Sequence, residues 1–199
     1  NYLKDFNEQI SLVSDVKDFK KYEDLSVTNF LENTRAYLKI QDGCNNFCSY
    51  CIIPYVRGTI KSRSKEEVIK EAKHLLSLGY KEIVLTGINI GNYFCADTKT
   101  NLAGLVKEIF AFEGNFRIRF SSIELPTVTD ELLEVVSNAG NKFCNYLHLP
   151  LQSGSSKVLK EMRRHYTAEE FLERLNYIRT KIKDIFVYTD IIAGFPTET

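Results

Sequence analysis

Residues 43–51 read GCNNFCSYC, and this stretch says more about the fold and chemistry of the chain than any other. Three residues separate the thiols of Cys44 and Cys48, and two separate those of Cys48 and Cys51. Thiols so close in sequence have poor geometry for a disulfide framework, and the total of five cysteines would leave one unpaired. The stretch therefore indicates a metal site.

The number of thiols restricts the kind of metal. A structural zinc site needs four ligands, usually as two pairs, and no second pair follows at a suitable distance. Thiolates suit iron–sulfur clusters, whose irons ordinarily take four cysteines, so three thiolates leave one iron open to a substrate or cofactor. A structural metal site and incidental buried cysteines remain the alternatives. Cys95 and Cys144 lack such neighbours and are interpreted as small buried hydrophobes.

Length and composition are those of an ordinary soluble domain. The 199 residues are 44% hydrophobic and 26% charged, and the formal net charge is zero, so any contact with RNA has to be local. No apolar run reaches the roughly 18 residues that span a bilayer, and no signal peptide opens the chain. We expect a cytoplasmic protein without membrane contact. Because the sequence starts at Asn1 and stops without a terminating element, we also expect a fragment.

The pattern of apolar residues divides the chain into two regions. Residues 1–34 are polar and charge-mixed without a sustained period, which is typical of a linker or the remnant of a preceding domain. From Arg35 onward, short β-branched runs alternate with amphipathic segments. Strands are predicted at residues 36–41, 82–86, 116–121, 146–149 and 185–192. Helices are predicted between the strands. Capping boxes at Ser64 and Thr167 start two of them, and Gly79 ends the first of these two. Asn101 and Thr129 are predicted caps of helices that end near Gly114 and Gly140, and a short helix is predicted over residues 155–162.

The alternation of strands and helices predicts an α/β fold with a parallel sheet and right-handed crossovers. Periodicity alone leaves two architectures open. One is a partial parallel (β/α) barrel that is cut after its fifth strand, and the other is a doubly wound sheet.

The cysteine stretch resembles the signature of the radical S-adenosylmethionine (SAM) superfamily, CxxxCxxC with an aromatic residue, here Tyr50, before the third cysteine. The resemblance implies the barrel architecture, a 4Fe-4S cluster on Cys44, Cys48 and Cys51, and SAM bound at the open iron. Electron transfer to SAM would then yield a 5′-deoxyadenosyl radical. These cysteines are the predicted catalytic and metal-binding residues.

Beyond the cysteines, residues 35–199 resemble the methylthiotransferase branch. The matching motifs are residues 37–44 (YLKIQDGC), 54–58 (PYVRG), 149–155 (LPLQSGS), 160–167 (KEMRRHYT) and 190–196 (DIIAGFP). Residues 41–43 and 85–91 are most similar to the enzymes that act on N6-threonylcarbamoyladenosine at position 37 of tRNA. Related subfamilies act on isopentenyladenosine in tRNA or on an aspartate of a ribosomal protein.

The resemblance and the position after strands together suggest a set of cofactor-binding residues, since α/β sites are built from the loops that follow strands. Superfamily members often carry Gly-Gly-Glu after the second strand, and this chain lacks that Glu. The predicted cofactor-binding residues are Tyr50, Thr86, Gly87, Glu124, Gln152, Arg164 and Gly194. Substrate or RNA contacts are predicted at Arg57 and Arg63, in a basic stretch with Lys61 and Lys65.

Each assignment has a simpler alternative. Glu124 could be a solvated loop acid, Arg163 and Arg164 a solvated helix end, and the basic stretch an exposed loop. His148, inside an apolar strand, is as consistent with a hydrogen-bonded core histidine as with a site residue.

The resemblance implies further parts and partners. Complete methylthiotransferases have an amino-terminal domain with a second 4Fe-4S cluster and a carboxy-terminal RNA-binding domain. It also implies the tRNA anticodon stem-loop as substrate and an electron donor such as flavodoxin or ferredoxin. Residues 1–34 contain no cysteine, so we expect the isolated piece not to complete methylthiolation.

Overall fold

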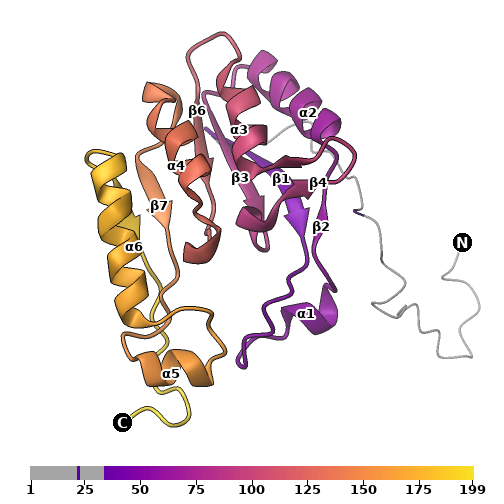
Figure 1. Ribbon diagram of the computed structural model, residues 1–199. Coiled ribbons are helices and arrows are strands. Elements are labelled where there is room, and N and C mark those ends of the chain that lie inside the picture. The colour runs from indigo at the N-terminus through magenta and orange to yellow at the C-terminus, as the bar shows by residue number, and fades with distance from the viewer. Residues whose placement is uncertain (1–21, 23–33) are drawn as a thin grey trace, which may run out of the picture.

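The computed structural model describes residue 22 and residues 34–199. Apart from residues 22 and 34, the predicted linker over 1–34 lies outside the described residues. Helices and strands alternate from Ala36 onward, as predicted (Figure 1). The strands are β1 (Ala36–Asp42), β2 (Lys61–Ser62), β3 (Glu82–Gly87), β4 (Phe94–Cys95), β5 (Thr100–Asn101), β6 (Arg117–Phe120), β7 (Tyr146–His148) and β8 (Phe186–Tyr188). The α-helices are α1 (Ile53–Val56), α2 (Lys65–Ser77), α3 (Leu102–Phe110), α4 (Asp130–Ser137), α5 (Ser156–Glu161) and α6 (Ala168–Lys181), with 3₁₀ turns η2 (Ile90–Asn92), η3 (Leu125–Thr127) and η4 (Gly140–Lys142).

The order of the strands is that of a partial barrel and not that of a doubly wound sheet. Strand β3 lies between β1 and β6 and is parallel to both, and β7 is parallel to β8. Isolated parallel bridges, Ile118 with Phe143 and Ser122 with His148, join β6 to the β7 segment. The long parallel strands thus follow one another in chain order, whereas a doubly wound sheet reverses its order at a switch point.

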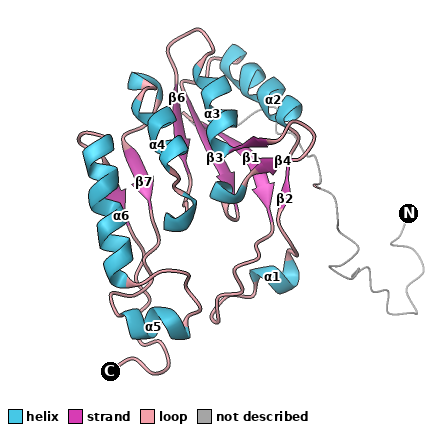
Figure 2. Cartoon of the chain, viewed as in Figure 1, coloured by secondary structure: helices cyan, strands magenta, loops and turns pink. Residues whose placement is uncertain are grey.

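The helices cover one side of these strands. Figure 2 shows α2, α3, α4 and α6 following one another along the sheet. The central strand β3 is buried from Glu82 to Leu85, as expected for a strand with a parallel neighbour on each side. Val68, Ala72 and Leu75 of α2 are fully buried in the same core. No helix among the described residues has both the length and the apolarity needed to cross a membrane.

The predicted helix caps are confirmed, with one difference. The side chains of Ser64, Asn101 and Thr129 each accept a hydrogen bond from the backbone N–H three residues on. Ser155, which was not predicted as a cap, does the same for α5. Thr167 forms the full reciprocal capping box with Glu170. At Ser64, only the bond from the Glu67 N–H to the serine hydroxyl is formed, so this helix begins with a simple cap. Helices α3 and α4 end four and three residues before the glycines that were expected to stop them.

The last strand is shorter than predicted. Residues 185–192 were expected to be extended, but β8 covers only Phe186–Tyr188, with a further bridge between Gln152 and Ile191. The ladder is irregular because Pro150 offers no N–H, and the Leu151 N–H donates to the Thr189 hydroxyl in place of a carbonyl. Gln152 then adopts a φ of 73°, which is uncommon for a residue with a side chain.

The sequence pattern did not predict several short elements. Strand β2 pairs antiparallel with the end of β1, β4 pairs with β5, and α1 follows the cysteine stretch. Two-residue strands carry no readable period, because alternation needs about four residues to be recognised.

Candidate active site at the carboxyl ends of the strands

The cysteine stretch begins where β1 ends, and hydrogen bonds to backbone carbonyls hold it both at its start and near its end. The Cys44 N–H donates to the Gly58 carbonyl at 3.1 Å. Gly43 has a φ of 74°, and a Cβ there would lie 2.0 Å from the Thr59 carbonyl oxygen, so this turn requires glycine. Farther along, the Ser49 N–H donates to the Met162 carbonyl and the Ser49 hydroxyl to the Glu161 carbonyl. The stretch therefore spans from β1 to the end of α5.

This arrangement puts the cysteines at one end of the sheet. In Figure 1 the arrowheads of β1 and β3 point toward the end of the molecule at which α1 and α5 lie. A cavity of about 260 Å³ opens there. Seven of the predicted site residues line it: Cys44, Cys48, Tyr50, Cys51, Glu124, Gln152 and Arg164. The tertiary structure thus brings together residues that are more than 100 positions apart.

Arg164 is the most connected side chain of the cavity. Its side chain is only 3% exposed, so it is not a solvated helix end. The Nη1 group donates to Glu124 Oε1 at 2.9 Å and lies 3.5 Å from both Cys48 Sγ and the Tyr50 hydroxyl. The Nε group donates to the Tyr166 hydroxyl, which donates in turn to the Pro150 carbonyl. Burial opposes the charge, but the Glu124 carboxylate outweighs it and raises the guanidinium pKa above its usual range.

Glu124 joins this arginine to the cysteine stretch. One carboxylate oxygen accepts from Arg164, and the other accepts from Asn46 Nδ2 at 2.5 Å. Asn46 lies between the first two cysteines, and its N–H is 3.4 Å from Cys44 Sγ. Glu124 is therefore not a freely solvated loop acid. It holds the arginine and the cysteine stretch in one hydrogen-bonded network.

Burial sets the proton affinities around the thiols. It raises the pKa of the Cys44 thiol, and the nearby Glu124 carboxylate adds to this effect. Burial also raises the pKa of the Tyr50 hydroxyl, although the Arg164 charge opposes the change. Metal binding requires the thiolate form, so a bound metal has to supply the favourable charge at Cys44.

Five predicted residues do not line the cavity. Gly87 packs against β1, where a Cβ would come within 2.7 Å of the Gln41 carbonyl oxygen, and Thr86 precedes it in β3. Gly194 is exposed, and its N–H donates to the Glu198 carboxylate. Arg57 forms an ion pair with Asp42, and its side chain is 47% exposed.

Arg63 requires a correction. Its side chain is 3% exposed, and its guanidinium contacts the Glu71 carboxylate of α2 at 2.5 Å. This buried pair fixes α2 against the sheet edge, and so the predicted contact of Arg63 with RNA does not fit the structure.

Sequence reasoning missed several residues of the cavity. Asn89, Ser122 and Asp190 line it, and Asp190 Oδ2 lies 2.8 Å from Nε2 of His148. Each of them follows a strand, which was the available signal, but small polar residues after strands are too common to single out. His148 itself does not line the cavity; its side chain is 28% exposed, so it is not a core histidine, and it contacts Asp190, which does line the cavity.

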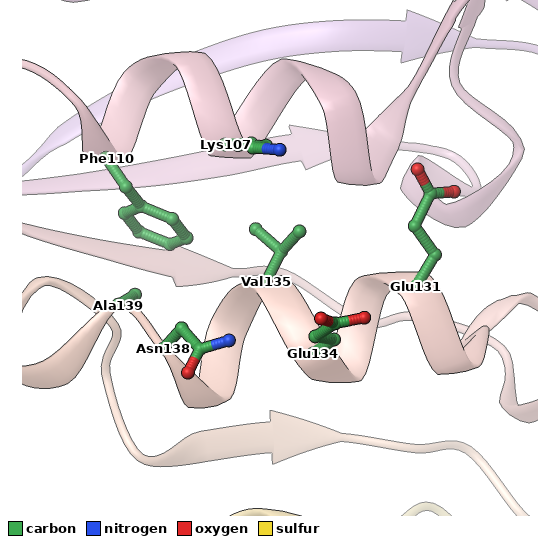
Figure 3. Close-up of a pocket in the computed structure, with 7 residues that line it drawn as sticks. All are labelled: Lys107, Phe110, Glu131, Glu134, Val135, Asn138 and Ala139. Carbon is green, nitrogen blue, oxygen red and sulfur yellow. The ribbon is translucent and has the colours of Figure 1, made fainter.

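A second cavity in the described part of the chain has no thiol groups. A cavity of about 300 Å³ lies between α3 and α4, and Figure 3 shows that Phe110, Val135 and acidic side chains line it without a thiol. Among the described residues, no three His, Cys, Asp or Glu side chains converge tightly enough to hold a single metal ion. In a cluster each thiolate binds its own iron, which calls for wider spacing than one ion does.

Comparisons with known proteins agree with this geometry. The family model of the radical SAM superfamily matches residues 38–199. The chain is 48% identical, over its full length, to the threonylcarbamoyladenosine tRNA methylthiotransferase MtaB of Bacillus subtilis, and covers 45% of that protein. It is 43% identical, over 97% of its length, to a tRNA-2-methylthio-N(6)-dimethylallyladenosine synthase of Thermoanaerobacter pseudethanolicus, of which it covers 41%. The chain thus spans less than half the length of these curated relatives.

Solved structures share the fold at low sequence identity. The radical SAM methyltransferase TsrM of Kitasatospora setae, solved with cobalamin and a [4Fe-4S] cluster, superposes with a TM-score of 0.66 at 19% identity, covering 82% of this chain and 32% of that one. The cobalamin-dependent SAM radical enzyme OxsB superposes with a TM-score of 0.65 at 16% identity, covering 78% and 23%. Together with the family match over residues 38–199, the cavity and its three thiols show that this chain belongs to the radical SAM superfamily.

Proposed function

We propose that this chain is the radical SAM core of a tRNA methylthiotransferase that acts on N6-threonylcarbamoyladenosine. The observation that carries the proposal is the single cavity into which three thiols, a buried arginine and its carboxylate partner converge. The subfamily is supported by the higher identity to the threonylcarbamoyladenosine enzyme, 48% against 43% for the dimethylallyladenosine enzyme.

The residues present fit an iron–sulfur cluster and SAM. Three thiols are the donor set that leaves one iron open, and the cavity holds buried polar atoms of Asn89 and Arg164 that have no partner within the described protein. Cys44, Cys48 and Cys51 would hold the cluster. When bound, the cluster and SAM would supply a 5′-deoxyadenosyl radical able to abstract hydrogen from an unactivated C–H bond.

The protein's own side chains orient and shield these groups. Arg164 places a fixed positive charge 3.5 Å from Cys48 Sγ, where it would stabilise the charge of a thiolate-bound cluster. Glu124 contacts both Arg164 and Asn46, and these bonds fix the position of the arginine charge relative to the cysteine stretch. Tyr50 and Pro150 form part of the cavity wall, and Gln152 offers an amide for hydrogen bonds to SAM.

The remaining assignments concern the whole protein. These 199 residues contain two cysteines besides the three of the cavity, Cys95 and Cys144, and both are buried. We therefore place the ligands of a second cluster in other parts of the full-length protein. The tRNA contacts of this piece are proposed at Arg57, whose side chain is half exposed beside the cysteine stretch.

The decisive experiment is anaerobic reconstitution with iron and sulfide, followed by SAM and a strong reductant, with chromatography for 5′-deoxyadenosine. We expect a brown protein that forms 5′-deoxyadenosine, and a Cys48→Ala variant that forms none. A colourless protein that binds zinc instead would support a structural metal module. For the substrate, the full-length enzyme should methylthiolate anticodon stem-loops that carry threonylcarbamoyladenosine, and a preference for isopentenyladenosine would overturn the subfamily.

A further inference from the structure

The cysteine stretch lies in a long connection between two paired strands. Strand β1 ends at Asp42, and β2 begins at Lys61, which is the antiparallel partner of Asp42. The connection over residues 43–60 therefore leaves the sheet and returns to it at the same place, and it carries all three thiols of the cavity. Where the thiols lie depends on what holds the two ends of this connection together.

The carboxylate of Asp42 contacts both ends of the connection. Its Oδ1 atom accepts a hydrogen bond from the Gly43 N–H at 2.7 Å, where the connection starts. Near the other end, Arg57 donates from Nε to Asp42 Oδ1 at 3.1 Å and from Nη2 to Asp42 Oδ2. The Cys44 N–H bonds to the Gly58 carbonyl beside this pair. Because a bidentate arginine–carboxylate pair fixes orientation as well as distance, Asp42 and Arg57 close the connection with a defined geometry.

Arg57 is itself fixed at the end of the helix that follows the third cysteine. Helix α1 begins two residues after Cys51, and the Arg57 N–H donates to the Ile53 carbonyl of this helix at 2.8 Å. The Arg57 carbonyl accepts from Lys61 Nζ at 3.1 Å. The Asp42 side chain is only 13% exposed, so the pair is partly shielded from water, and such a pair is stronger than one on the open surface. The ion pair thus connects the end of β1 to the helix beside Cys51.

We propose that Asp42 and Arg57 are positioning residues for the iron–sulfur cluster, whose ion pair closes the connection around the three thiols before iron is bound. This inference rests on the proposed function. Ligands that are already held together lose less conformational freedom when they bind, so the site should assemble more readily and release iron more slowly. Neither Asp42 nor Arg57 lines the cavity, and the pair therefore acts through the backbone of the cysteine stretch.

Lys39 provides a matched control for this role. Its Nζ atom contacts the same Asp42 carboxylate at 2.7 Å, but both residues belong to β1, so this contact closes no loop. In amide hydrogen exchange of the protein before reconstitution, peptides from residues 43–58 should exchange roughly 3- to 10-fold faster in Arg57→Gln than in the wild type. In Lys39→Gln they should stay within about twofold of the wild type. Tm should fall by a similar small amount in both variants, because each loses one partly exposed ion pair.

Iron loss from the reconstituted protein measures the consequence for the cluster. An excess of a ferrous chelator is added under anaerobic conditions, and the brown absorbance is followed in the absence of RNA, because Arg57 is also proposed to contact tRNA. Asp42→Asn and Arg57→Gln should each lose iron roughly 3- to 10-fold faster than the wild type, and Lys39→Gln at nearly the wild-type rate. The double variant should be no faster than the faster single variant, since both changes remove the same pair.

The outcomes separate this inference from the proposed function. Wild-type rates in Arg57→Gln, an equal effect of Lys39→Gln, or a double variant whose effect is the product of the two single effects would overturn the positioning role. If Asp42→Asn does not fold, Arg57→Gln carries both measurements, since its side chain is half exposed. The expected rates in a protein that forms no 5′-deoxyadenosine would overturn the proposed function and leave the pair in place. A wild-type protein that assembles no cluster would overturn both.

Discussion

Single residues decide the charge balance of the cavity. Arg164 is a buried cation that contacts one carboxylate, one thiol and two phenols, and the rest of the site is arranged around it. A buried cation is stable only when its partners compensate for lost water, and here Glu124 provides the opposite charge. The cavity therefore depends on Glu124 even before any ligand is bound.

The first prediction removes that charge. Glu124→Gln keeps the shape of the side chain but leaves the Arg164 guanidinium buried without a carboxylate, so the free energy of unfolding should fall by about 2–4 kcal/mol. Urea denaturation of the protein before reconstitution measures it. Glu134→Gln, on the exposed face of α4, serves as the matched control and should change stability by less than about 0.5 kcal/mol. Equal stability of the two variants would contradict the role given to Glu124.

The second prediction concerns Gln41. Gln41→Leu removes hydrogen bonds to the Asn89 N–H and to the Gly43 and Asp42 carbonyls, and leaves these groups without their partner. We expect a loss of roughly 2–4 kcal/mol in stability and less iron bound per chain after reconstitution. The two measurements are urea denaturation and iron analysis. Wild-type values in both would show that the tie between β3 and the cysteine stretch is dispensable.

At the level of elements, ion pairs join the central strand β3 to β6 and to the start of β1 at the end opposite the cavity. Glu82 begins β3, accepts a hydrogen bond from Arg119 Nε of β6 at 2.7 Å and contacts Arg117 at 3.3 Å. Arg35, just before β1, lies 3.6 Å away. Burial alone would raise the pKa of the Glu82 carboxyl, but the arginines outweigh it and hold the pKa below its usual value.

The third prediction is the pH dependence of this pairing. Since the folded pKa is depressed, Glu82 stabilises the fold fully above its unfolded pKa of about 4.3, and the contribution is lost as the pH falls through the folded value. Glu82→Gln should therefore be about 1–3 kcal/mol less stable than the wild type at pH 7, with the difference shrinking below about pH 4. Denaturant unfolding at several pH values measures it. A difference that grows on acidification would show that the sign is wrong.

At the level of the whole molecule, the cysteine stretch connects the first strand to the second half of the chain. Ser49 bonds to Glu161 and Met162 at the end of α5, and Arg164 lies two residues after Met162. A cluster held by this stretch would bind only when both halves are in place, so binding and folding are coupled.

The fourth prediction follows from this coupling. Reconstitution should raise Tm by several degrees, and removal of iron with a chelator should return it to the value of the protein before reconstitution. Differential scanning calorimetry under anaerobic conditions measures the shift. The Cys48→Ala variant should show no shift under the same treatment, and an equal shift in both proteins would place the bound metal elsewhere.

Local patterns were sufficient for much of the fold. The helix caps at Ser64 and Thr167 and the buried run of β3 were readable because caps and periodicity depend on residues a few positions apart. The three cysteines were readable for the same reason, since their spacing alone carries the signal. Two-residue strands and the irregular end of β8 were not, because pairing between distant segments decides them.

The sequence by itself determined the α/β class, the helix starts and the thiol donor set, because each depends on neighbours along the chain. Periodicity left the barrel and the doubly wound sheet open, the family resemblance implied the barrel, and the strand order confirmed it. Only the tertiary structure decided which charged residues are exposed and which are buried. Arg164 shows the reason, since a solvated helix end was the alternative for it, and folding instead buries it against Glu124, which lies 40 positions away in sequence. Burial of a charge depends on which partner folding brings to it, and no local pattern encodes that partner.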